Sequence, residues 1–165
     1  MLESLEDAGE ELKRADHLVY VSLKYTRTAD VLLNSLNRMI DCYDHLIQAL
    51  LEYAKDSKGL EVIPKTPIEK GRVLKEYYDQ QEILDNIDLY FLLRKIVRST
   101  HSSEQEYRRH VCIITTIDGR EEIINIDIIT QYLEFEKKFY GFVVNLIGER
   151  AKEHHKEEEE GWEKE

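Results

Sequence analysis

The sequence has few of the residues that interrupt helices, with two prolines and seven glycines among 165 residues. Proline removes a backbone donor and glycine adds backbone freedom, so their scarcity favours long helices. The two cysteines, Cys42 and Cys112, are too few for a disulfide framework and favour a reducing compartment. No apolar run approaches the roughly 20 residues that span a bilayer, and the acidic start lacks the apolar segment of a secretory signal. We therefore expect a cytoplasmic protein with no membrane partner.

Positive charge is scarce as well. Lys and Arg total 23 against 34 Asp and Glu, which gives a formal net charge of −11. Because phosphate attraction requires basic surface, this balance argues against a protein covered all over by nucleic acid, but it permits a local basic patch. The motifs GxGxxG, GKS/GKT and CxxC do not occur, and there is no serine nucleophile elbow. We predict no cofactor and no metal site.

The clearest helical pattern lies in residues 28–55, which contain no Gly and no Pro. Apolar residues recur there at intervals of three and four, which places them on one helical face. These residues are Leu32, Leu36, Met39, Tyr43, Ile47, Leu50 and Ala54. The stripe predicts a central helix whose apolar face the other helices cover.

The same spacing predicts a first helix over residues 2–24. We expect it to break near Arg27, because a helix of over roughly fifty residues would be far outside the usual length. Continuity is the alternative, since nothing around Arg27 forbids a helix. Gly59 is suited to the turn that ends the central helix.

Two further helices are predicted before the chain turns to strand. Thr66, Pro67 and Glu69 form a capping box with proline at the first helical position, which predicts a helix over residues 67–79. The next apolar pattern predicts a helix over residues 81–98. Residues 99–103 are polar and are expected to form a loop.

The hydrophobic period changes after this loop. Residues 111–117 are rich in β-branched side chains, Asp118 and Gly119 are a strong hairpin turn, and residues 122–126 continue the pattern. This predicts a β-hairpin within residues 109–126. Such a hairpin is marginal alone, so it must pack on the helices or pair with a second copy.

Asp127 is the expected cap of a last helix over residues 128–152. Phe135 and Phe142 widen the apolar stripe of this helix beyond what a simple surface helix requires. The sequence therefore predicts a mainly α fold: a single-domain helical bundle of about four to five helices over residues 1–150, with a β-hairpin before the C-terminal helix. Residues 151–165 are acidic, and we expect them to be disordered.

Seven basic side chains lie within residues 94–110 of this acidic chain, and we name them the basic island: Arg94, Lys95, Arg98, His101, Arg108, Arg109 and His110. Guanidinium groups match phosphate oxygens, so an RNA contact through Arg94, Lys95, Arg98, Arg108, Arg109 and His110 is one interpretation. The interpretation that we favour is that the first cations complement the negative end of a helix dipole and that the later ones lie at the solvent-exposed start of a strand.

Arg94 and His101 are seven residues apart, so a helix that continued to His101 would bring them to one face. Arg could then hold a phosphate while His acts as general base or acid. Arg38 and His45 have the same spacing in the central helix, which shows how readily such a pair arises by chance.

The helix order, the connector IPKTPIEK and the segment FLLRKIVRSTH resemble HEPN domains over about residues 10–101. The family consists of small helical bundles associated with RNA cleavage in toxins and defence systems, and with inactive partners of nucleotidyltransferases. Its active members carry an Arg and a His separated by four to six residues. The resemblance implies a catalytic pair of Arg94 and His101, metal-independent RNA cleavage, and a site formed across a dimer interface.

Three hypotheses follow from the sequence. The first is a non-catalytic interaction module that forms a homodimer through its C-terminal helix and hairpin. The second is a HEPN-like ribonuclease, and the third is RNA binding without cleavage through the basic island. We rank the interaction module first because no specific catalytic motif is present.

Overall fold

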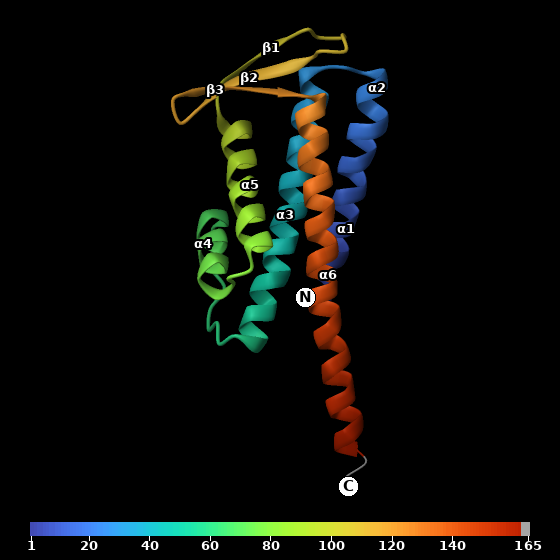
Figure 1. Ribbon diagram of the computed structural model, residues 1–165, viewed down its shortest axis with the longest axis vertical. Helices are drawn as coiled ribbons and strands as arrows, with labels where there is room; N and C mark the ends of the chain where they lie inside the picture. Colours follow the sequence, from blue (N-terminus) through green and yellow to red (C-terminus); the bar gives the residue numbers. More distant parts are fainter. Residues whose placement is uncertain (163–165) are drawn as a thin grey trace.

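The computed structural model describes residues 1–162, with side chains described up to residue 149. The elements, in chain order, are α1 (Leu2–His17), the π-helix η1 (Leu18–Ser22), α2 (Leu23–Tyr25), α3 (Ala29–Ser57), α4 (Pro67–Tyr77), α5 (Gln81–Arg98), β1 (His101–Glu104), β2 (Cys112–Ile117), β3 (Arg120–Asn125) and α6 (Ile126–Trp162). The long helices run side by side, α4 packs beside α5, and a small sheet lies across one end of the bundle (Figure 1). The predicted mainly α bundle is confirmed.

Helix α3 is the centre of the core, as its apolar stripe predicts. Leu32, Leu36 and Leu50 are completely buried, and α1, α5 and α6 all contact this helix. The Thr28 side chain accepts a hydrogen bond from the Val31 amide at 3.3 Å, which satisfies one of the free amides at the helix start. None of the helices in residues 1–162 is long and apolar enough to cross a membrane.

The predicted break near Arg27 is confirmed, and residues far away in the chain contact it. The first helical stretch ends at Tyr25, and α3 begins at Ala29. The Tyr107 amide donates to the Arg27 carbonyl at 2.6 Å, and the Ala29 amide donates to the Glu106 carboxylate at 3.2 Å. The loop between β1 and β2 therefore satisfies the polar groups that the break exposes.

The predicted start of α4 is confirmed: Thr66 accepts a hydrogen bond from the Glu69 amide at 3.4 Å. The helix ends at Tyr77, slightly before the expected residue 79. Gly71 is buried and faces Phe91 of α5. A Cβ atom at this position would lie 2.5 Å from Cζ of Phe91, which is too close for two carbon atoms. Glycine therefore lets α4 and α5 approach closely.

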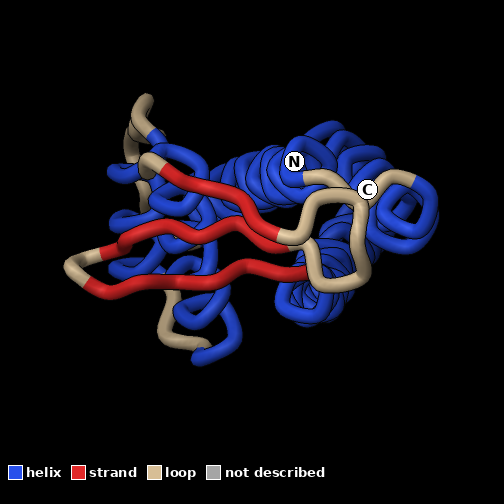
Figure 2. Tube along the Cα trace, turned by 90° about the horizontal axis from the view of Figure 1, so that it is seen from above, coloured by secondary structure: helices blue, strands red, loops and turns tan. Residues whose placement is uncertain are grey.

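The predicted hairpin before the last helix is confirmed, since β2 and β3 pair antiparallel on either side of Asp118 and Gly119. The expected loop at residues 99–103 is wrong, because it contains β1, which adds a third strand and gives an antiparallel sheet in the order β1-β2-β3 (Figure 2). The register places His101 opposite Thr115, and Ile117 opposite Arg120. All four β1 side chains are exposed, so the strand has no apolar alternation that could reveal it in the sequence.

Helix α6 begins at Ile126 and extends beyond the other helices (Figure 1). Its cap is Asn125, whose Oδ1 accepts a hydrogen bond from the Ile128 amide at 2.9 Å, and not the expected Asp127. The expected helix end at residue 152 is also wrong, because α6 continues to Trp162. Residues 163–165 lie outside the described part of the chain, and the disorder expected for 151–165 stays a prediction.

Candidate nucleic-acid interface

The structure divides the basic island between two separate surfaces. Arg94, Lys95 and Arg98 occupy the last turns of α5 and line a groove against α4. Arg109 and His110 belong to the loop between β1 and β2 and line a different pocket at the end of the bundle that carries the sheet. We name these surfaces the α4–α5 groove and the sheet-end pocket.

The α4–α5 groove has a volume of about 290 Å³. Its cationic side chains and its apolar floor come from both helices: Ile68, Arg72, Phe91, Arg94, Lys95 and Arg98. Lys95 is paired with Asp118 at 3.0 Å. Arg72 and Arg98 are exposed, and neither has an ion pair with any residue whose side chain the structure describes. The groove therefore presents two unneutralised guanidinium groups.

Arg94 contacts Tyr90 and Asp44 on the side that faces the core. Its guanidinium group lies 5.6 Å from the centre of the Tyr90 ring, donates to Tyr90 Oη at 3.3 Å, and is 3.9 Å from the Asp44 carboxylate. The Tyr90 hydroxyl itself donates to Asp44. Burial first, and then the hydrogen bond to Asp44, raises the pKa of Tyr90, so the phenol remains a donor. The guanidinium group of Arg94 therefore already has partners on its inner side.

His101 does not share a helical face with Arg94. Helix α5 ends at Arg98, and Ser99 is already extended, with ψ of 150°. His101 lies on β1 with an exposed side chain whose Nδ1 is 3.1 Å from the Ser99 carbonyl. The one-helix arrangement of Arg94 and His101 is therefore wrong, because α5 ends before His101. The ribonuclease hypothesis, with a site formed across a dimer interface, stays a prediction.

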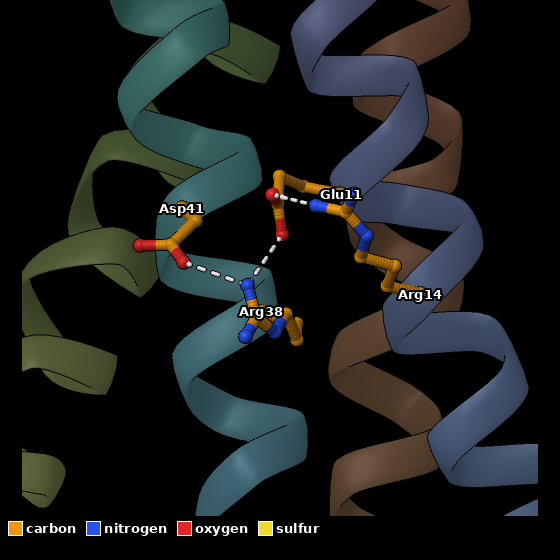
Figure 3. Close-up of polar contacts among 4 residues, drawn as sticks. All are labelled: Glu11, Arg14, Arg38 and Asp41. Carbon is orange, nitrogen blue, oxygen red and sulfur yellow. Dashed lines mark hydrogen bonds and ion pairs between the residues drawn. The ribbon is translucent and has the colours of Figure 1, made fainter.

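Arg38 and His45 do share one uninterrupted helix, α3, but Arg38 is already used in a network between helices (Figure 3). Glu11, with a side chain 12% exposed, contacts Arg14 at 2.6 Å and Arg38 at 3.2 Å, and Arg38 also lies 3.6 Å from Asp41. Burial, followed by repulsion from Glu11, raises the pKa of Asp41. Since its charges are matched, we interpret this network as a link between α1 and α3.

Arg72 is the groove residue that the sequence did not reveal. It lies on α4, apart from the basic island, and only the packing of α4 on α5 brings it next to Arg94 and Arg98. Conversely, Arg108 belongs to the island but lines neither the groove nor the sheet-end pocket. Clustering along the chain was therefore an incomplete guide to clustering in space.

No family model matches the chain, and no match was found among the curated proteins or the solved structures compared with it. The resemblance to HEPN domains therefore rests on the sequence features alone. Charge, burial and side-chain geometry are what indicate a function for this chain.

Proposed function

We propose that the protein is a non-catalytic helical module that binds the phosphate backbone of RNA in the α4–α5 groove. The observation that carries this proposal is the convergence of Arg72, Arg94, Lys95 and Arg98 in a chain of net charge −11. Arg72 and Arg98 form no ion pair with any described side chain, so their charge is open to a ligand. Planar guanidinium groups suit phosphate oxygens because they donate two parallel hydrogen bonds.

The apolar floor of the groove favours single-stranded over double-stranded RNA. Phe91 is half-buried and Ile68 is 43% exposed, so both offer apolar surface between the arginines. Unstacked bases can contact such surface while the backbone lies along the cations, whereas bases inside a duplex cannot.

Binding without cleavage is the form of the proposal that agrees with the geometry. His101 lies on β1, and no residue lining the groove is a histidine. The arginines can neutralise phosphate charge, but a general base beside them is missing from the groove lining. We expect RNA to remain intact after prolonged incubation with the protein, as read on a denaturing gel; cleavage that His101→Ala abolishes would restore the ribonuclease hypothesis.

The proposal is tested by fluorescence anisotropy with a labelled single-stranded RNA of about 20 nucleotides and a duplex of the same sequence. The double variant R72Q/R98Q should weaken single-strand binding by about tenfold or more. It should also make the dependence of log K on log salt shallower by about 1.4, because two phosphate contacts are lost.

The matched control is R120Q, which removes one positive charge from an exposed position on β3 outside the groove. The single variants R98Q and R120Q each remove one positive charge, so their effects on RNA affinity can be compared directly. Equal effects of these two variants would show that only overall charge matters, and would contradict a site in the groove.

Self-association through α6 and the sheet stays a prediction from the sequence. Phe135 on α6 and Ile123 on β3 are 40% and 48% exposed, and β3 has no strand partner on its outer side within the described chain. Such exposed apolar positions favour a second copy as a partner. Sedimentation velocity at micromolar concentration should show a dimer, and a stable monomer would overturn this prediction.

A further inference from the structure

The sheet-end pocket has a volume of about 400 Å³, and neither its position nor its chemistry is explained by the RNA groove. It lies where the first helical stretch, the sheet and the start of α6 meet. A pocket of this size falls in the range that accommodates small ligands. Its lining combines an apolar floor with a basic rim.

The floor is formed by residues of the first helical stretch and of α6. Val19 and Leu23 are only 4% and 1% exposed, so the half-buried Ile126 at the start of α6 supplies more of the accessible apolar surface. Tyr20 also lines the pocket and is 39% exposed. This surface can bury an apolar or aromatic group but supplies little charge of its own.

The rim is basic and is assembled from two distant segments. Lys24 and Arg27 come from the end of the first helical stretch, and Arg109 and His110 come from the loop between β1 and β2. The backbone hydrogen bond from Tyr107 to Arg27 joins the two segments. The pocket has one carboxylate, Asp127, and among the described side chains Lys24, Arg27 and Arg109 form no ion pair.

The helix wall of this pocket is irregular. Val19 and Tyr20 belong to the π-helix η1, which interrupts an otherwise α-helical stretch. Single π-turns are rare and occur often at functional sites, because they redirect side chains at a cost in backbone stability. The irregularity here includes two of the residues that line the pocket.

We infer that the sheet-end pocket binds a nucleoside monophosphate, with the base on the apolar floor and the phosphate at the basic rim. A phosphate monoester carries close to two negative charges near neutral pH and several acceptor oxygens, which suits the three cations and the imidazole. Inorganic phosphate has no apolar group, so it would leave the apolar floor of the pocket without a contact. A fatty carboxylate would bring a single charge to a rim that offers several.

The same chemistry occurs in a free mononucleotide and at the 5′-phosphorylated end of an RNA. The inference does not depend on the α4–α5 groove, because the two surfaces share no lining residue. Variants of one surface therefore leave the other intact, and failure of either proposal can be recognised separately.

The test is isothermal titration of the full chain with AMP and UMP, and with adenosine and inorganic phosphate as the two partial ligands. We expect at least one nucleotide to bind about tenfold or more tightly than either partial ligand. The variant R109Q should weaken that binding by about tenfold. R108Q is the matched control, since Arg108 is the exposed neighbour in the same loop and does not line the pocket.

Absence of binding of both nucleotides at millimolar concentration would overturn the inference, as would equal weakening by R109Q and R108Q. A second variant, R27Q, supplies an independent check from the helical side of the rim. R27Q and R109Q change side chains only, so the backbone hydrogen bond from Tyr107 to Arg27 is retained.

The source of the ligand is then decided with oligonucleotides that carry either a 5′-phosphate or a 5′-hydroxyl group. Preference for the 5′-phosphate that is lost in R109Q identifies an RNA end as the ligand. Binding of AMP or UMP without such a preference identifies a free nucleotide. Both outcomes support the pocket, whereas oligonucleotide discrimination that survives in R109Q contradicts it.

Discussion

Glu136 is an acidic side chain placed where a charge is costly. It lies on α6, is 0% exposed, and neither carboxyl oxygen has a hydrogen-bond partner among the described side chains. Burial raises the pKa of Glu136 well above its usual value of 4.5, and the neighbouring Cys42 thiol lowers it only in part. We therefore expect the carboxyl group to keep its proton to a higher pH in the folded protein than an exposed glutamate does.

This has a defined consequence for stability. The folded state keeps the proton to a higher pH than the unfolded chain, so more protons are bound in the folded state between the two pKa values. The free energy of unfolding then falls as the pH rises, by about 1.4 kcal/mol per pH unit.

The variant E136Q removes this titration and keeps the shape of the side chain. Urea unfolding between pH 5.5 and 7.5 should show the free energy of unfolding of E136Q rising relative to that of the parent as the pH increases, with a slope of up to about 1.4 kcal/mol per pH unit. Measurements stay below pH 8 because the thiols of the unfolded chain titrate near 8.5. Replacement by leucine should stabilise the protein by about 1–3 kcal/mol at pH 7, since it removes a buried polar group without a partner.

Glu134 provides the control on the same helix. It is exposed, and hydrogen bonds from Tyr20 and Lys137 lower its pKa, so it is ionised in both states over this pH range. The difference between E134Q and the parent should therefore stay constant from pH 5.5 to 7.5. If the difference between E136Q and the parent is equally constant, the reasoning about the buried carboxyl is refuted.

Three other substitutions test the packing and the caps. Thr28→Ala removes the cap of α3 and should cost about 1 kcal/mol in urea unfolding. Gly71→Ala places a Cβ atom 2.5 Å from Phe91 and should cost about 1–3 kcal/mol; a neutral result would show that the two helices can separate easily. Glu11→Gln weakens the link between α1 and α3 and should cost about 1–2 kcal/mol, whereas the same change at the exposed Glu10 should be nearly neutral.

Several predictions that depended on residues close together in the sequence were accurate. The apolar period of residues 28–55, the capping box at Thr66 and the pattern of residues 81–98 each correspond to a helix in the structure. Periodicity and capping act over about four residues, so they can be recognised without knowing the fold. The same is true of the Asp118-Gly119 turn, whose two residues both have positive φ.

The candidate site was predicted only in part. Arg94, Lys95 and Arg98 line the α4–α5 groove, but their partner Arg72 comes from another helix. Sequence clustering suggested one basic surface, because it does not show in which direction the chain turns after α5 ends at Arg98.

What the sequence by itself determined is the set of helices, the capping box at Thr66 and the hairpin turn, because these depend on side chains close together in the chain. What only the tertiary structure decided is the third strand, the contacts made by the break at Arg27 and the two separate basic surfaces. Strand β1 is defined by backbone hydrogen bonds to β2, and those donors and acceptors are identical in every sequence. The groove and the pocket exist because packing brings together side chains from elements that are distant in the chain, and no local pattern records that contact.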